Sequence, residues 1–357
     1  MPSTSHHTGM WRGTVETKGL IKMDRPCLFS YATSELSQDA FFAYLLSWAA
    51  DKYEGSAEHD LGRTFLKKMF ELSGKEMPKK IETKVYRQCD NMDIFCEING
   101  KEFALIFEDK VSSFEHGNQL ERYWNTVKGY GYNDEAILGI YCKTHEISHK
   151  PSDSRYHVMD RHVLLELLGS MEGEAACEEN NVVADFKSHL EHIDNLINEF
   201  KYRPTNGRQD WDGMAWSGFF TALQKELNEG EWNYVPNASG GFMGFWWHWR
   251  DVDGGNVYLQ LEESKACFKV EVGDEKKAQE LKYGWNQKFI EAGDKVGTTE
   301  IRVVYPNRMR VGSYMTVAVL EKDYRVWDNG KLNFDATIKN LKAMEKILNE
   351  AIDSSRP

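Results

Sequence analysis

Two acidic residues and a lysine stand near the ends of two predicted strands joined by a short turn. The turn is Asn99-Gly100, a dipeptide typical of two-residue type I′ hairpins. If it forms, Asp93, Glu108 and Lys110 project from one face of the hairpin, and Asp93 lies diagonal to Glu108 at about 7–8 Å between backbone positions. Two carboxylates at this range can hold a divalent cation, and a lysine beside them can bind an anion.

The predicted register pairs Ile98 with Lys101 and places Asp93 opposite Ile106. The opposite face of the hairpin then carries apolar side chains that predict a core: Ile94, Cys96, Ile98, Phe103, Leu105 and Phe107. Acidic groups buried without a cation or a counter-charge would be costly, which favours a site on the acidic face. The alternative is that Asp93 is a surface charge close to a turn.

The hairpin resembles the active site of the PD-(D/E)xK nuclease superfamily, in which an Asp ends one strand and Glu-x-Lys ends the next. Here the matching residues are Asp93 and Glu108-Asp109-Lys110. The resemblance implies that Asp93 and Glu108 bind Mg²⁺ or Mn²⁺, with the backbone carbonyl of Asp109 as a further ligand. Lys110 would orient the attacking water or stabilise charge on phosphorus. Its alternative interpretation is a surface lysine paired with Glu108.

Two further motifs support the same resemblance, which covers roughly residues 30 to 170. The sequence Q-L-E-R-Y at 119–123 resembles the Q-L-x-x-Y helix of one branch of the superfamily, and Gln119 and Tyr123 share a helix face. That branch implies that Gln119 contacts the substrate backbone or braces Lys110, supported by Tyr123. The alternative is a core Tyr123 and a solvent-facing Gln119. Glu35 resembles the acidic residue of the first helix, or is a first-turn acid favoured by the helix dipole.

The elements that would position these residues alternate in type, which predicts an α/β fold. The resemblance implies a restriction-endonuclease-like mixed central sheet flanked by helices. Apolar periodicity predicts helices over 34–53, 58–73, 112–130, 161–171 and 182–202, and strands over 81–88, within the hairpin at 91–110, and over 136–143 and 156–159. A strand, helix and strand after Lys110 predict a parallel crossover.

The second half of the chain has a different pattern. Residues 1–23 are expected to be a loose tail, 24–203 the nuclease-like domain, and 204–357 a smaller α+β domain with an antiparallel sheet that binds substrate or a partner. The expected helices are 211–227, 276–292 and 336–352, and the expected strands are 242–249, 256–262, 266–272, 300–305 and 314–321. Trp246, Trp247 and Trp249 predict either a sheet core or a surface that stacks bases.

Charge and composition limit the function classes. The 357 residues carry a formal charge of −12, which opposes tight binding of nucleic acid by the whole surface. Arg302, Arg308 and Arg310 form the best local candidate for phosphate contact. Six cysteines without C-x-x-C spacing favour a reducing, cytoplasmic setting. No apolar run approaches the roughly 20 residues of a membrane span, so no membrane association is expected.

These observations predict a metal-dependent nuclease that hydrolyses phosphodiester bonds with Mg²⁺ or Mn²⁺. DNA is the substrate that the resemblance implies, and a protein partner or a homodimer is a further expectation. Two alternatives stay open: an RNA-directed nuclease, and a non-catalytic module on the same fold that binds nucleic acid or protein. The complete set of Asp93, Glu108 and Lys110 argues against the non-catalytic module, because a decayed site would usually lose one of them.

Overall fold

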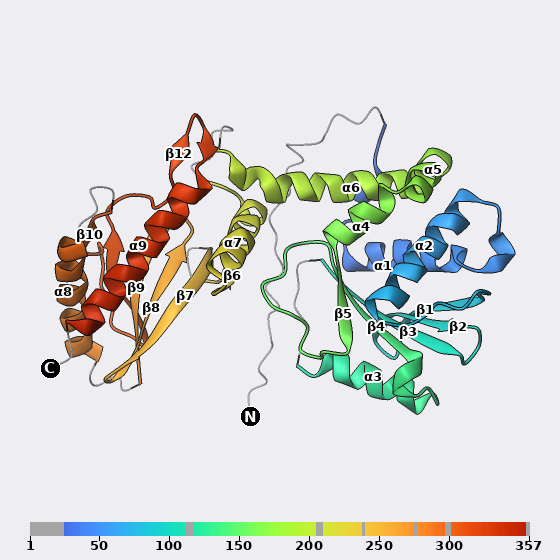
Figure 1. The fold of residues 1–357 in the computed structure, drawn as a ribbon, viewed down its shortest axis with the longest axis horizontal. Helices are drawn as coiled ribbons and strands as arrows, with labels where there is room; N and C mark the ends of the chain where they lie inside the picture. Colours follow the sequence, from blue (N-terminus) through green and yellow to red (C-terminus); the bar gives the residue numbers. More distant parts are fainter. Residues whose placement is uncertain are drawn as a thin grey trace, which may run out of the picture.

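The computed structural model describes residues 25–111, 117–204, 210–237, 240–273, 278–296 and 301–354. Figure 1 shows two sheets, each with its own helices, arranged along the long axis of the molecule. The predicted N-terminal tail lies outside the described residues. The predicted domain boundary near residue 204 lies beside the undescribed segment 205–209, and Phe200 before it already packs with the core of the second sheet.

The first sheet is a mixed five-stranded sheet with the order β1-β2-β3-β4-β5. Its strands are β1 (Thr83–Cys89), β2 (Met92–Ile98), β3 (Phe103–Lys110), β4 (Ile137–Lys143) and β5 (Tyr156–Asp160). The first three are antiparallel, and β3, β4 and β5 run parallel. The sequence therefore predicted the α/β class and the parallel crossover after Lys110 correctly.

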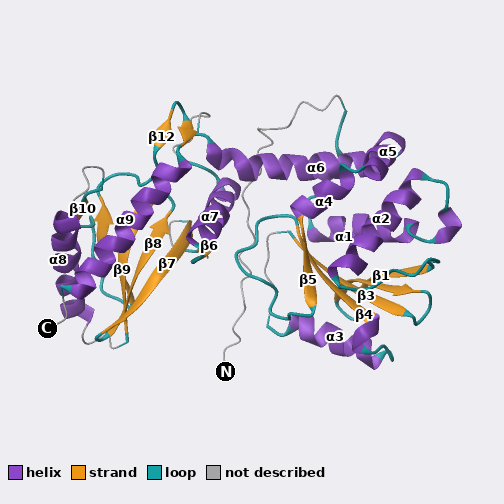
Figure 2. Ribbon diagram, viewed as in Figure 1, coloured by secondary structure: helices purple, strands orange, loops and turns teal. Residues whose placement is uncertain are grey.

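Helices cover both faces of this sheet, with α3 on one side and α1 and α2 on the other (Figure 2). The helices are α1 (Glu35–Trp48), α2 (Ala57–Leu72), α3 (Gln119–Gly129), α4 (Arg161–Leu168), α5 (Met171–Glu179) and α6 (Asn181–Asn198). Short 3₁₀ turns lie at Leu28–Ser30, Asp51–Tyr53, Asp134–Ala136 and Glu199–Lys201. The predicted apolar hairpin face packs into the core on the α1 and α2 side, as expected. The α3 side has a separate core that contains Phe95 and Ile106.

The predicted hairpin register was wrong by two residues. Ile98 pairs with Phe103, so the connection spans residues 99–102. Asn99 and Gly100 have positive φ angles of 53° and 66°, but the Asn99 side chain donates to the carbonyl of Lys80 and accepts from the amide of Glu82 instead of serving a two-residue turn. Because a two-residue shift is even, every side chain keeps its predicted face.

A two-residue turn does occur one connection earlier. Cys89 pairs with Met92, and Asp90 and Asn91 between them have φ angles of 48° and 67°, as a type I′ turn requires. This turn holds β1 against β2 and presents the carbonyl of Asn91 toward α3, where Tyr123 binds it.

Several predicted boundaries also differ from the structure. The first helix ends at Trp48, and residues 51–53 form a separate 3₁₀ turn. The α3 helix begins at Gln119; the predicted start at 112 lies outside the described residues, and residues 117–118 form a turn. Helix α5 was not expected, because it is mostly Glu, Ala and Gly and lacks a clear apolar stripe.

The second sheet is antiparallel and six-stranded, with the order β10-β11-β9-β8-β7-β6. Its strands are β6 (Glu231–Val235), β7 (Phe242–Val252), β8 (Gly255–Glu262), β9 (Lys265–Val272), β10 (Val303–Val304) and β11 (Tyr314–Leu320). Strand β6 was not predicted. The remaining elements are α7 (Gly213–Leu227), α8 (Ala278–Val296), the β12 (Trp327–Asp328) and β13 (Lys331–Leu332) hairpin, and α9 (Phe334–Asp353).

Three helices pack on one face of this sheet. Ring contacts join Phe220 of α7 to Phe245 of β7, and Phe289 of α8 to Phe268 of β9. From α9, Glu345 accepts a hydrogen bond from the indole of Trp247, which is fully buried. Trp247 is therefore a core residue, which agrees with the sheet-core alternative for this tryptophan.

Candidate active site

The two predicted carboxylates lie next to each other at the end of the hairpin. Ile94 pairs with Phe107, and one step further along the ladder Asp93 stands opposite Glu108. The pair is therefore directly opposed, where the sequence had predicted a diagonal. Oδ2 of Asp93 accepts a hydrogen bond from the backbone amide of Asp109 at 3.0 Å, which fixes its carboxylate against β3.

Lys110 bridges both carboxylates. Its Nζ lies 2.6 Å from Oε1 of Glu108 and 3.7 Å from Oδ2 of Asp93. Only 8% of the Lys110 side chain is exposed, so the surface alternative for this lysine is wrong. The two carboxylates raise the pKa of the Lys110 ammonium against the opposing effect of burial. The ammonium therefore stays protonated and supplies a fixed positive charge.

The side chain of Glu108 is fully buried and strained electrostatically. Burial raises its pKa to about 8, with the charge of Asp93 adding to the rise and Lys110 opposing it. Among the described residues no donor reaches Oε2 of Glu108. A proton on Glu108 would let it donate to Asp93, and this hydrogen bond is one of the influences that raise the pKa. Oε2 of Glu108 is therefore the position that a proton or a cation can occupy.

The first turn of α3 places two predicted residues against Glu108. Nε2 of Gln119 donates to Oε1 of Glu108 at 2.7 Å and to the hydroxyl of Tyr123 at 2.8 Å. The Tyr123 hydroxyl in turn donates to the carbonyl of Asn91 at 2.5 Å. Gln119 thus braces Glu108, where the resemblance had implied Lys110 or the substrate. Tyr123 is both a core residue and the support of Gln119.

Glu35 begins α1 and reaches the same strand end from the other face of the sheet. Its Oε1 accepts a hydrogen bond from the backbone amide of Val111, immediately after Lys110, at 3.1 Å. The structure therefore brings Glu35 to the rim of the site as well as to the first turn of a helix.

The side chain of Asp109 points away from Asp93 and Glu108, toward α1. It is fully buried, and burial together with Asp39 raises its pKa well above the usual range. Asp39 itself is buried, and burial and the charge of Asp93 raise its pKa to about 7. Sequence reasoning missed Asp39, although it follows Glu35 by four residues and so shares its helix face.

Lys143 is a second lysine that the sequence reasoning missed. It ends β4 and pairs in register with Lys110, so both side chains leave the same face of the parallel ladder. Only 1% of it is exposed, and burial lowers its pKa to about 8 while Glu35 opposes that shift. A lysine closing an apolar run at the same sheet edge as Lys110 was the available signal.

The donor set fits a hard divalent cation held by few protein ligands. Asp93 and Glu108 offer adjacent carboxylate oxygens, one of them without a donor. Within the described ranges no group of three or more His, Cys, Asp and Glu side chains is arranged to hold an ion. Mg²⁺ does not require such a group, because it keeps several of its waters and takes one or two protein carboxylates.

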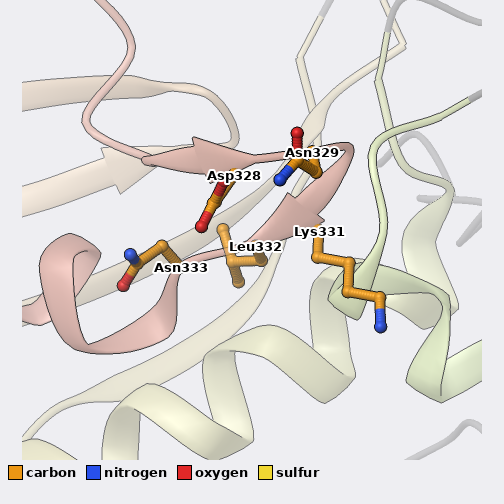
Figure 3. Close-up of a pocket in the computed structure, with 5 residues that line it drawn as sticks. All are labelled: Asp328, Asn329, Lys331, Leu332 and Asn333. Carbon is orange, nitrogen blue, oxygen red and sulfur yellow. The ribbon is translucent and has the colours of Figure 1, made fainter.

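An open hollow elsewhere has an ordinary structural explanation. Asp328, Asn329, Lys331, Leu332 and Asn333 line it at the β12 and β13 hairpin (Figure 3). Asn333 caps α9 by accepting from the amide of Ala336. The polar groups that line the hollow thus belong to the β12–β13 turn and to the N-terminus of α9.

Comparison of the chain with protein-family models, with curated proteins and with solved structures finds no match in any of the three. In the described part of the chain, no helix combines the length and the apolar character that crossing a bilayer requires.

Proposed function

We propose that this chain is a metal-dependent nuclease of the PD-(D/E)xK type that hydrolyses phosphodiester bonds, with DNA as its substrate. The observation that carries the proposal is the convergence of Asp93, Glu108 and Lys110 within salt-bridge distance at one strand end. A restriction-endonuclease-like fold for the first sheet is part of the proposal. It is supported by an antiparallel hairpin followed by a parallel strand through α3.

Asp93 and Glu108 are the residues that would hold Mg²⁺ or Mn²⁺. When bound there, the cation supplies charge neutralisation for a phosphate and acidifies a water ligand. The backbone carbonyl of Asp109 stays an expectation from the resemblance. Glu35 reaches the same strand end and would contribute a further carboxylate near the ion.

The remaining residues act on charge and orientation. Lys110 keeps its proton and holds a positive charge next to the position where a phosphate would sit, so it can stabilise negative charge as it develops. Gln119 fixes the orientation of Glu108, and Tyr123 fixes Gln119. The cysteines of the described chain are free thiols, which supports a reducing compartment, and we propose the cytoplasm.

Cleavage assays test this proposal on linear, circular, single-stranded and double-stranded DNA and on RNA, with Mg²⁺, with Mn²⁺ and with chelator. We expect metal-dependent cleavage that Asp93→Ala and Lys110→Met both abolish. Glu97→Gln is the matched control, because Glu97 lies on the same strand and face but contacts Tyr86 instead. Wild type inactive on every substrate, or Lys110→Met as active as wild type, would overturn the proposal. Preferential cleavage of RNA would identify RNA, in place of DNA, as the substrate.

A further inference from the structure

The connection between β10 and β11 is unusually exposed. Tyr305 is 62% exposed, Val311 50% and Tyr314 61%. Arg308 and Arg310 between them are exposed as well, and neither guanidinium forms an ion pair with a described residue. We call residues 305–314 the arginine loop. Exposed tyrosine rings and unpaired guanidinium groups on one loop are side chains that can stack on bases and bind phosphates.

The charge of this segment is opposite to that of the whole chain. Residues 301–320 contain three arginines and no Asp or Glu, within a protein of formal charge −12. Arg302 is the one of the three that is paired, at 3.2 Å from Glu321. The arginine loop is therefore a local basic surface on an acidic protein, as an anionic ligand requires.

Contacts with the sheet and α8 anchor the loop. Tyr314 begins β11 and pairs with Glu271 of β9, so the sheet holds its backbone while solvent still reaches its ring. From α8, Nζ of Lys282 lies 3.5 Å from the carbonyl of Met309. An anchored loop loses less conformational entropy on binding than a free one.

The loop leads onto the sheet face that α7, α8 and α9 leave uncovered. Tyr314 shares this face with Thr316, which pairs with Lys269, which pairs in turn with Tyr258. The indole of Trp249 stacks on the Tyr258 ring at 3.8 Å with the planes 9° apart, and Trp249 is 39% exposed. Thr316 and Lys269 thus separate Tyr314 from the stacked pair, in which Tyr258 is buried and Trp249 is exposed.

We propose that the arginine loop binds a single strand of nucleic acid, with Arg308 and Arg310 on phosphates and with Tyr305 and Tyr314 stacked on bases. Guanidinium groups bind backbone phosphates, and exposed rings stack unpaired bases of any sequence. The choice of ligand rests on the proposed nuclease function, because that activity needs a surface to hold its substrate. The loop supplies such a surface despite the acidic average of the chain.

Binding measurements on the full chain test this inference without cleavage. Fluorescence anisotropy with labelled single-stranded DNA, single-stranded RNA and duplex DNA of about 20 nucleotides covers the range of roughly 4–16 nucleotides for such sites. Chelator is present throughout. We expect single strands to bind more tightly than duplex, and the DNA and RNA arms identify the preferred strand.

Two pairs of substitutions separate charge from stacking. Arg308→Ala with Arg310→Ala should weaken binding about tenfold and reduce the salt slope by about 1.4, since each phosphate contact on a single strand contributes about 0.7. Tyr305→Ala with Tyr314→Ala should weaken binding about 30-fold or more and leave the salt slope unchanged. The control is Lys339→Ala with Lys342→Ala, which removes the same charge from exposed positions on α9.

Several results would overturn the inference. These are no binding of any nucleic acid by wild type, preference for duplex, equal binding of polyglutamate, or an equal loss in the Lys339 and Lys342 control. Failure of the nuclease proposal would appear as absent cleavage with binding intact, and failure of this inference as cleavage that is insensitive to the arginine loop.

Discussion

Gln119, the first residue of α3, donates a hydrogen bond from Nε2 to Oε1 of Glu108 on β3 at 2.7 Å. The same oxygen lies 2.6 Å from the ammonium of Lys110. Two donors therefore occupy Oε1, and Oε2 is left as the oxygen that can accept a cation. Gln119 thus fixes the orientation of Glu108 and, within the described chain, leaves Oε2 as the free oxygen of that carboxyl group.

Replacing Gln119 with alanine should lower cleavage about 10–100-fold, the usual cost of losing a residue that orients a metal ligand. Raising the Mg²⁺ concentration should restore part of the activity, because the defect lies in how Glu108 meets the ion. The measurement is a Mg²⁺ titration of the cleavage rate. Asn125→Ala on the exposed side of the same helix is the control and should behave as wild type. Equal rates for Gln119→Ala and wild type at all Mg²⁺ concentrations would contradict this role.

Asp93→Asn should abolish cleavage and raise the stability of the metal-free protein. The charge of Asp93 raises the pKa of both Glu108 and Asp39, so its removal relieves repulsion among buried carboxyls. The asparagine oxygen can still accept from the amide of Asp109. Stabilisation of about 0.5–2 kcal/mol is expected, as for other changes that relieve a strained site. Urea unfolding in chelator measures it, and a loss of stability would show that Lys110 outweighs the repulsion.

The sequence predicted the composition of this site better than its geometry. Alternation along β2 and β3 placed Asp93, Glu108 and Lys110 on one face, and an even register shift could not change that. The register itself depended on Asn99, whose side chain binds a segment some 19 residues earlier in the chain. A tertiary contact of that kind leaves no signature in a turn dipeptide.

Asp39 and Lys143 were missed for the same reason, because their place in the site depends on tertiary contacts. Asp39 and Lys143 reach the site only because α1 crosses the end of β3 and because β4 lies in register beside it. Each side chain alone is an ordinary helix or strand-end charge. The predicted parallel crossover implied that β4 would lie beside β3. Only the register of the two strands shows that Lys143 lies opposite Lys110.

The crossing of α1 and α2 depends on the absence of a side chain at Gly62. A Cβ atom there would lie 2.8 Å from the carbonyl oxygen of Leu45 and 2.9 Å from the amide nitrogen of Ala49. Gly62→Ala should therefore destabilise the protein by about 1–3 kcal/mol, as overpacking typically does. It should also lower cleavage, because α1 carries Glu35 and would be displaced.

Gly129→Ala is the matched control for that experiment. A Cβ at this last residue of α3 would meet nothing within 4 Å, so its effect should stay within about 0.5 kcal/mol. Thermal unfolding of the two variants measures the difference. Equal midpoints would show that α1 and α2 can separate without cost and that the close crossing is unimportant.

The stability of the metal-free protein should fall as the pH rises from about 6.5 to about 8. Burial raises the pKa of Glu108 to about 8, so in this range the folded protein holds a proton that the unfolded chain has already released. A state that binds more protons loses stability as protons become scarce. Burial also lowers the pKa of His145 to about 3 and of His189 to about 4, and these groups give the opposite slope only below about 6.5.

Glu108→Gln isolates this contribution, because its amide mimics the protonated acid and does not titrate. Thermal midpoints in chelator should decline less steeply with pH in the variant than in wild type, and Asp39, whose pKa is raised to about 7, should account for part of the decline that remains. Added Mg²⁺ should reverse the slope for wild type alone, since the ion takes the place of the proton and binds better as Glu108 ionises. A wild-type slope that Glu108→Gln leaves unchanged would mean that Glu108 is already ionised at neutral pH, paired with Lys110 rather than waiting for a cation.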